Sequence, residues 1–241
     1  MTPKIVTTLD GSATLFSDSF DDHYHSMNGA LSESMHIFIG YGLHEIMKTK
    51  QSVNILEIGF GTGLNALCTL KEADIHQLKI NYIGIEPFPL DKEIAFQLNY
   101  SDFFDDPAHH QAYKDMHTHK KNVPFQLTPN FFLNIIQSPV QDTEFRKASF
   151  DLVYFDPFKP ETQSDVWSPF IFSKIFHAMN SDGILVTYSS KGMVRKAMEE
   201  AGFQVEKLPG PFGKREISRA SKESVSMALK EHLCECNDSD Y

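Results

Sequence analysis

The stretch Glu57-Ile58-Gly59-Phe60-Gly61-Thr62-Gly63 decides the fold of this chain. An apolar run at residues 53–58 leads into its glycines, and an apolar helical pattern at 64–73 follows them. A buried strand, a glycine-rich turn and a helix in this order predict a βαβ unit whose backbone approaches a nucleotide-like cofactor. A dinucleotide site would have the spacing G-x-G-x-x-G, whereas these glycines fall as G-x-G-x-G.

An acid placed two residues before the first glycine indicates which cofactor the turn suits. A carboxylate at Glu57 would attract an ammonium group and repel a pyrophosphate. S-adenosylmethionine carries an ammonium, a sulfonium and no phosphate, so the pattern favours this cofactor. Gly59, Gly61 and Gly63 each lack a Cβ that would keep a ligand from the backbone. The alternative is a tight turn that binds no ligand.

Apolar runs alternate with helical patterns along most of the chain. Strands are predicted at residues 53–58, 80–85, 131–137, 150–155, 183–188 and 203–208, with a last, antiparallel strand at 217–220. Helices are predicted at 64–73, 90–98, 169–179, 193–201 and 222–234. This alternation predicts an α/β fold with a mostly parallel, doubly wound, Rossmann-like sheet covered by helices on both faces.

The first 50 residues lie outside this alternation. Short apolar runs at 4–9 and 13–16 predict a hairpin, and residues 33–47 have helical apolar spacing. We therefore expect an N-terminal extension or cap at 1–50, a cofactor-binding domain at 51–222, and a C-terminal helix with an acidic tail at 223–241. The polar, histidine-rich stretch 101–123 predicts a mobile surface loop, with a metal site as the less favoured alternative.

Composition limits the location and the partners. The 241 residues include no apolar run long enough to span a membrane, no signal-peptide pattern and only three cysteines, so we expect a cytoplasmic protein. Cys234 and Cys236 lie in the acidic tail, where an inert pair is favoured over zinc. The net charge of −10 argues against nucleic acid, yet residues 186–222 hold eight basic and four acidic side chains. A basic face and an ordinary solvated surface both fit that count.

Two further acids follow predicted strands. Glu86 follows the strand at 80–85, where a carboxylate can accept both ribose hydroxyls of a nucleoside. Asp156 opens the turn after residues 150–155, where an acceptor could orient a nucleophilic nitrogen and favour loss of its proton. Phe158 could stack on a base or flank a cationic methyl group. A surface glutamate and a plain Asp-Pro turn are the alternatives.

The N-terminal block at residues 22–33 is unusually polar and aromatic. It predicts a lid over the site, although a capped helix start at Ser32 is an equal interpretation. Motifs typical of other enzyme classes are missing from the sequence: it has no G-x-S-x-G elbow, no P-loop and no cysteine nucleophile near a predicted strand end.

Four separated motifs resemble the MnmC-like methyltransferases, the tRNA wobble-uridine enzymes that make 5-methylaminomethyl-2-thiouridine. They are the block from Tyr24 to Leu43, the cofactor run from Leu56 to Asn65, the run from Phe155 to Pro160 followed by Trp167, and the runs at 192–196, 202–203 and 213–216. The resemblance spans most of residues 20–220. It implies a class I methyltransferase of the stand-alone MnmD type, because 241 residues leave no room for an FAD-dependent oxidase. Neither FAD nor a metal is expected.

The resemblance also implies roles for individual residues. The cofactor would be bound by Glu57, Gly59, Gly61, Gly63, Asn65 and Glu86. Asp156 would engage the substrate amine, and Glu33 would help to close that pocket. Apart from the resemblance, we expect Tyr24 and Phe158 to bind the substrate, and Lys191, Arg195, Lys214 and Arg215 to bind phosphates.

Two departures from the family pattern affect the cofactor and substrate pockets. Pro157 stands where glycine is usual. Ser138-Pro139 replaces a Gly-Asp pair whose acid meets adenine, which leaves the backbone, Gln141 or Asp142 for that contact.

We therefore expect an S-adenosylmethionine-dependent N-methyltransferase for the primary amine of 5-aminomethyl-(2-thio)uridine in the tRNA anticodon loop. Another enzyme would supply the aminomethyl uridine. One rival is an enzyme of the same fold that acts on a small amine, or a polyamine synthase, which the acidic net charge favours. A second rival is a non-catalytic RNA-binding module.

Overall fold

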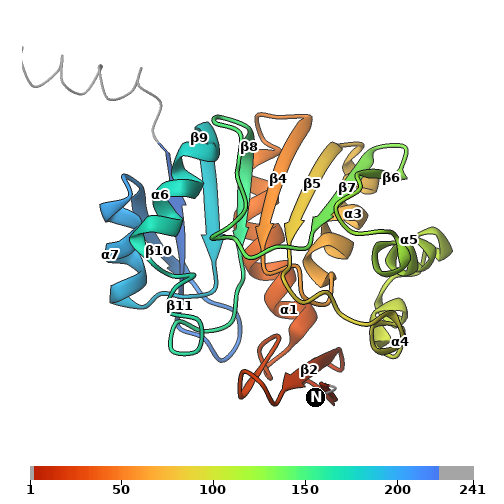
Figure 1. Ribbon diagram of the computed structural model, residues 1–241. Coiled ribbons are helices and arrows are strands. Elements are labelled where there is room, and N and C mark those ends of the chain that lie inside the picture. The colour runs from red at the N-terminus through yellow and green to blue at the C-terminus, as the bar shows by residue number, and fades with distance from the viewer. Residues whose placement is uncertain (1–2, 223–241) are drawn as a thin grey trace, which may run out of the picture.

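The computed structural model describes residues 3–222, and an eight-stranded sheet forms its centre (Figure 1). The strand order is β10-β11-β9-β8-β4-β5-β7-β6. The strands are β4 (Ser52–Ile58), β5 (Lys79–Ile85), β6 (Phe125–Thr128), β7 (Phe131–Ile136), β8 (Phe150–Phe155), β9 (Met179–Thr187), β10 (Gln204–Pro209) and β11 (Glu216–Ser221).

The predicted mostly parallel sheet is confirmed. Strands β9, β8, β4, β5 and β7 pair in parallel, and β11 lies between β9 and β10 and runs antiparallel to both. The edge strand β6 pairs antiparallel with β7 and was not predicted. The chain proceeds from β4 to β5 and β7, then returns to β8 on the other side of β4. The strand order therefore reverses between β4 and β8, which is where ligands bind in open α/β sheets.

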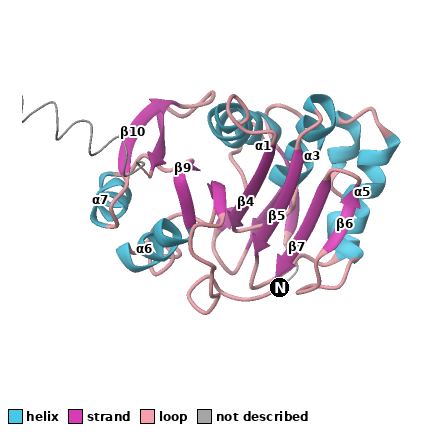
Figure 2. Ribbon diagram, turned by 90° about the horizontal axis from the view of Figure 1, so that it is seen from above, coloured by secondary structure: helices cyan, strands magenta, loops and turns pink. Residues whose placement is uncertain are grey.

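Helices cover both faces of the sheet (Figure 2). They are α3 (Leu64–His76), α4 (Lys92–Ala95), the 3₁₀-helix η2 (Asn99–Phe103), α5 (Pro107–Thr118), α6 (Pro169–Ala178) and α7 (Gly192–Glu200). One apolar cluster joins the sheet to α3 and α5, and a second joins it to α6 and α7. Two buried layers on opposite faces explain why the central strands are apolar on both sides. No helix among residues 3–222 is long and apolar enough to cross a membrane.

The N-terminal segment lies across the carboxyl ends of the strands (Figure 1). The predicted hairpin is present as β1 (Lys4–Thr7) and β2 (Ala13–Ser17), with β3 (Asp22–His23) added as a third strand. Next come α1 (Ala30–Ser34), η1 (Met35–Leu43) and α2 (His44–Ile46). The helical spacing predicted at residues 33–47 is present as these helices, and the middle one, η1, is a wider π-helix.

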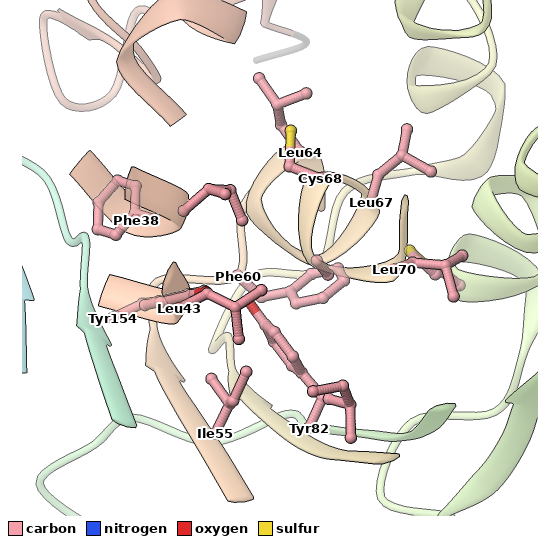
Figure 3. Packing of buried hydrophobic residues seen from close by; sticks show 14 of the residues in the cluster. Phe38, Leu43, Ile55, Phe60, Leu64, Leu67, Cys68, Leu70, Tyr82 and Tyr154 are labelled. Atoms are coloured by element: carbon pink, nitrogen blue, oxygen red, sulfur yellow. The ribbon is translucent and has the colours of Figure 1, made fainter. Parts of the chain in front are cut away.

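Close packing fixes η1 on the sheet. The rings of Phe38 and Tyr154 have centroids 5.3 Å apart, and a Cβ on Gly42 would lie 3.2 Å from the Tyr154 ring. Figure 3 shows Phe38 and Leu43 in one cluster with side chains from α3, β4, β5 and β8. Since these side chains are fully buried together, the N-terminal segment belongs to the same hydrophobic core as the central sheet and α3.

The prediction of a mobile loop at residues 101–123 was wrong. Residues 107–118 form α5, which starts with an N-cap at Asp106 and with Pro107 in its first turn. Two of its histidines are buried, with His109 bonded to Asp74 and His117 bonded to the Thr62 carbonyl. The polar composition of this stretch concealed a helix that buries two of its three histidines.

Of two other predicted helices, one is shorter in the structure and the other lies almost entirely outside the described residues. The helix predicted at 90–98 is shortened to α4 and followed by the 3₁₀-helix η2. The helix predicted at 222–234, with Cys234 and Cys236, lies outside the described residues apart from position 222.

We predict that Gly59→Ala destabilises the fold. Gly59 has φ of +88°, and an added Cβ would lie 2.6 Å from the Asp156 carbonyl oxygen. The left-handed backbone alone costs about 1–2 kcal/mol with a side chain, and the backbone clash adds to it. Gly192→Ala is the matched control, because its added methyl meets no atom within 4 Å. Urea unfolding measures both, and equal stabilities would contradict this packing of the β4 turn against β8.

Candidate active site

A cavity of about 220 Å³ opens beside the carboxyl ends of β4 and β8. It brings together many residues predicted from the sequence: Tyr24, Gly59, Gly61, Asn65, Glu86, Asp156 and Phe158 line its wall. A smaller cavity of about 140 Å³ beside α5 has no carboxylate in its wall. The position and the acidic groups of the larger cavity make it the candidate active site.

The glycine turn shapes one wall of the cavity. The Gly61 N–H donates to Glu86 Oε2 over 2.9 Å, and the Phe88 N–H donates to Glu86 Oε1 over 2.9 Å. Glu86 is thus held by two backbone groups, and its burial raises the pKa of its carboxyl above the usual value. An added Cβ on Gly61 would lie 3.3 Å from the Tyr24 ring, so the turn and the N-terminal block meet closely.

The other wall contains a carboxylate bridged to the core. The Asn65 side-chain amide donates to Glu57 Oε1 and to Asp156 Oδ2, both over 2.9 Å. Its own oxygen accepts from the Ser34 hydroxyl over 2.6 Å, and the Tyr82 hydroxyl donates to Glu57 Oε2 over 2.9 Å. Glu57 is fully buried and lies behind the cavity wall. A hydrogen-bond chain therefore runs from the core to Asp156.

The environment of these acids changes their titration. Burial raises the pKa of Glu57 to about 8, against the opposing hydrogen bonds from Asn65 and Tyr82. Burial also raises the pKa of Asp156 well above its usual value, and the nearby carboxylates of Glu33 and Glu57 raise it further. Both acids therefore hold a proton more tightly than a solvent-exposed carboxyl does.

Glu33 joins the N-terminal block to the loop between β10 and β11. It accepts from the Ser26 N–H over 2.8 Å and from Lys214 Nζ over 2.9 Å. Lys214 Nζ also lies 4.5 Å from the centroid of the Tyr188 ring, and the Tyr188 hydroxyl donates to the Pro157 carbonyl over 2.9 Å. Glu33 and Lys214 thus form a closure next to the cavity, and neither belongs to its wall.

The remaining predicted residues lie farther from the cavity wall. Gly63 has left-handed φ at the start of α3, and Lys191 forms an exposed ion pair with Glu161. Arg195 is half-buried on α7, and Arg215 is exposed. None of these four residues lines the cavity.

The two residues considered for the adenine contact lie in different places. Gln141 lines the cavity beside Pro139. Asp142 is exposed and outside the wall.

The cavity also contains aromatic and imidazole groups that the sequence did not single out. Phe20 stacks on Phe158 with ring centroids 4.4 Å apart, and Tyr24 meets Phe158 edge to face at 4.9 Å. His25 bonds to the Thr14 hydroxyl, and burial lowers the pKa of His25 to about 4, which keeps the ring neutral. Aromatic density just before residue 24 was the available signal for Phe20.

These groups fit a nucleoside that carries an amino acid end and no phosphate. Gly59 and Gly61 line the cavity with backbone alone, Glu86 lies on the same wall with its carboxylate, and acids flank Asn65. The fold and this cavity define a class I S-adenosylmethionine-dependent methyltransferase.

Comparisons with known proteins agree with this class. A family model described as S-adenosyl-L-methionine-dependent methyltransferase matches residues 105–223. The tRNA 5-methylaminomethyl-2-thiouridine biosynthesis bifunctional protein MnmC of Campylobacter hominis is 31% identical over 225 residues, covering 92% of this chain and 33% of that protein. The protein of the same name from Burkholderia mallei is 32% identical over 244 residues, covering 89% and 36%. The chain spans about a third of the length of these relatives.

Solved structures support the fold. MnmC2 from Aquifex aeolicus superposes with a TM-score of 0.74 at 22% identity, covering 96% of this chain and 75% of that one. Spermidine synthase from Thermotoga maritima superposes with a TM-score of 0.52 at 10% identity, covering 92% and 72%. The chain is an S-adenosylmethionine-dependent methyltransferase that is similar in sequence to these MnmC proteins.

We predict that Glu57→Gln changes how stability depends on pH. Between about pH 4.5 and 8 the folded protein holds a proton on Glu57 that the unfolded chain has released, so stability falls as pH rises. This one group contributes a slope of at most about 1.4 kcal/mol per pH unit. Urea unfolding of the ligand-free chain from pH 5 to 8 should show a flatter decline in Glu57→Gln. Glu199→Gln on the exposed face of α7 is the control, and a slope unchanged in Glu57→Gln would contradict the assignment.

Proposed function

We propose that this protein transfers a methyl group from S-adenosylmethionine to the primary amine of 5-aminomethyl-(2-thio)uridine at the wobble position of tRNA. The MnmC relatives are named for the biosynthesis of tRNA 5-methylaminomethyl-2-thiouridine, which supports the choice of nucleoside. The observation that carries the proposal is the Asp156 carboxylate, which faces the cavity and is fixed by the Asn65 amide.

The cofactor would be held by residues from three strand ends. S-adenosylmethionine supplies an electrophilic methyl group when it is bound. Glu86 would accept the ribose hydroxyls, Gly59 and Gly61 would let the cofactor approach the backbone, and Gln141 lies on the side proposed for adenine. Glu57 would act from behind the wall by fixing the orientation of Asn65.

Asp156 would prepare the amine. An alkylamine is mostly protonated near neutral pH, because its pKa is about 10. A carboxylate with a raised pKa accepts a proton from such a group with a smaller free-energy cost. Asn65 occupies Asp156 Oδ2, while Oδ1 accepts no hydrogen bond from residues 3–222. That second oxygen would orient the nitrogen toward the methyl group.

The base would bind beside Asp156. Phe20, Tyr24 and Phe158 form an aromatic group on the cavity wall, which suits stacking by a uridine turned out of a single-stranded loop. Lys191, Arg195, Lys214 and Arg215 remain the candidates for anticodon-loop phosphates, with Lys214 requiring release from Glu33. A separate enzyme that supplies the aminomethyl uridine and a cytoplasmic location complete the proposal.

We predict that Asp156→Asn lowers methyl transfer by at least about 100-fold, because general-base contributions are of this size. The assay is transfer of labelled methyl from S-adenosylmethionine to tRNA from cells that lack the modification, followed by nucleoside mass spectrometry. Cofactor binding, measured by calorimetry, should change little. Asp165→Asn, an exposed change in the same loop after β8, is the control.

Two outcomes would contradict the proposal in different ways. Unchanged turnover in Asp156→Asn would remove the role of that carboxylate. A wild-type protein that labels small amines but no wobble uridine would favour the small-amine enzyme instead. No labelling of either acceptor despite cofactor binding would favour the RNA-binding module.

A further inference from the structure

Three potential metal ligands meet on the side of α3 that packs against the N-terminal segment. His44 begins α2, while Glu72 and His76 lie four residues apart on one face of α3. The His44 Nε2 lies 2.6 Å from Glu72 Oε2, and the His76 Nε2 lies 3.5 Å from the same oxygen. All three donor atoms lie within 4.8 Å of one another.

The exposure of the three side chains suits an ion reached from solvent. Glu72 is 9% exposed, whereas His44 and His76 are 42% and 40% exposed. A buried carboxylate thus forms the floor of the group, and the two imidazoles form its rim. Donor atoms bound to one tetrahedral zinc ion at about 2.0–2.1 Å lie about 3.4 Å apart. The pair at 3.5 Å already has this spacing, and rotation of the half-exposed His44 ring would open the 2.6 Å hydrogen bond.

We propose that His44, Glu72 and His76 bind one divalent transition-metal ion of the zinc type. Two imidazoles and one carboxylate form a donor set that suits zinc and its neighbours, with water in the fourth position. The ion would join α2 to α3, two segments that are far apart in the sequence. η1 and α2 pack on the core, and α3 begins at the glycine turn. The ion would therefore strengthen the attachment of the N-terminal segment to α3 and the central sheet.

A second histidine–carboxylate pair, between α3 and α5, differs from this group because it has only two donors in the described part of the chain. His109 and Asp74 also form a histidine–carboxylate pair, with His109 Nε2 2.8 Å from Asp74 Oδ2. Asp74 lies on α3, as Glu72 does, but no third donor joins this pair among residues 3–222. A histidine–carboxylate pair by itself is an ordinary hydrogen bond, so the third ligand is what distinguishes the proposed site.

The test is titration of the full-length, untagged chain with Co²⁺ and Zn²⁺ in a Cys234→Ser, Cys236→Ser background, which removes the thiols of the tail. Glu72→Gln keeps the shape of the side chain and a hydrogen-bonding oxygen, so it should fold. It should weaken Zn²⁺ binding by at least about 10–100-fold, since loss of an outer-shell partner alone has that effect. Asp74→Asn removes the same charge from the same helix and should bind like the parent chain.

Further measurements separate the site from general effects on folding. Co²⁺ should show visible absorption from nitrogen and oxygen ligands, and Zn²⁺ should raise the melting temperature of the parent and of Asp74→Asn but not of Glu72→Gln or His76→Ala. Equal Zn²⁺ affinity in the parent and Glu72→Gln, or no binding at micromolar Zn²⁺ by the parent, would overturn the proposal. Because the methyl-transfer assay is not a readout here, failure of the metal site leaves the proposed function unaffected.

Discussion

The site depends on one amide that separates two carboxylates. The two N–H groups of Asn65 point to Glu57 and Asp156, each over 2.9 Å. Without a donor between them, two acids at adjacent strand ends would repel each other and compete for protons. The Ser34 hydroxyl fixes the remaining oxygen of the amide, so its orientation is defined. The position of the Asp156 carboxylate follows from this arrangement.

That arrangement requires a particular strand pairing, a particular start of α3 and a particular position of the N-terminal segment. β4 and β8 must be parallel neighbours, as shown by the Asp156 N–H that donates to the Ile58 carbonyl over 2.9 Å. α3 must begin directly after the glycine turn so that its second residue reaches both acids. The N-terminal segment must supply Ser34 from beside the sheet. The N-terminal segment therefore helps to fix the orientation of Asn65, although the description of residues 1–50 as a separate cap stays a prediction.

Features encoded by local patterns could be predicted from the sequence. The strand at 53–58, the glycine turn and Asp156 each carry their signal within about ten residues. Seven of the predicted site residues line the cavity, and the ones at strand ends come together because the strand ends of a parallel sheet meet at one edge.

Features that depend on long-range neighbours could not be predicted. The contacts of Ser34 with Asn65 and of Tyr82 with Glu57 join segments 31 and 25 residues apart. The burial of Glu57 behind the wall and the pairing of Lys214 with Glu33 likewise follow from packing. The α5 helix was missed because histidines occupy two of its five buried positions and weaken the apolar period, although Asp106-Pro107 was a valid start signal.

The most direct measurement is a crystal structure with S-adenosylhomocysteine and a short anticodon-loop RNA that carries 5-aminomethyluridine. The proposed function predicts that the amine nitrogen lies within hydrogen-bonding distance of Asp156 Oδ1, with the Asn65 bridge to Glu57 retained. An amine bound outside the cavity, or a cofactor whose binding breaks the Asn65 bridge and turns Asp156 away, would contradict it.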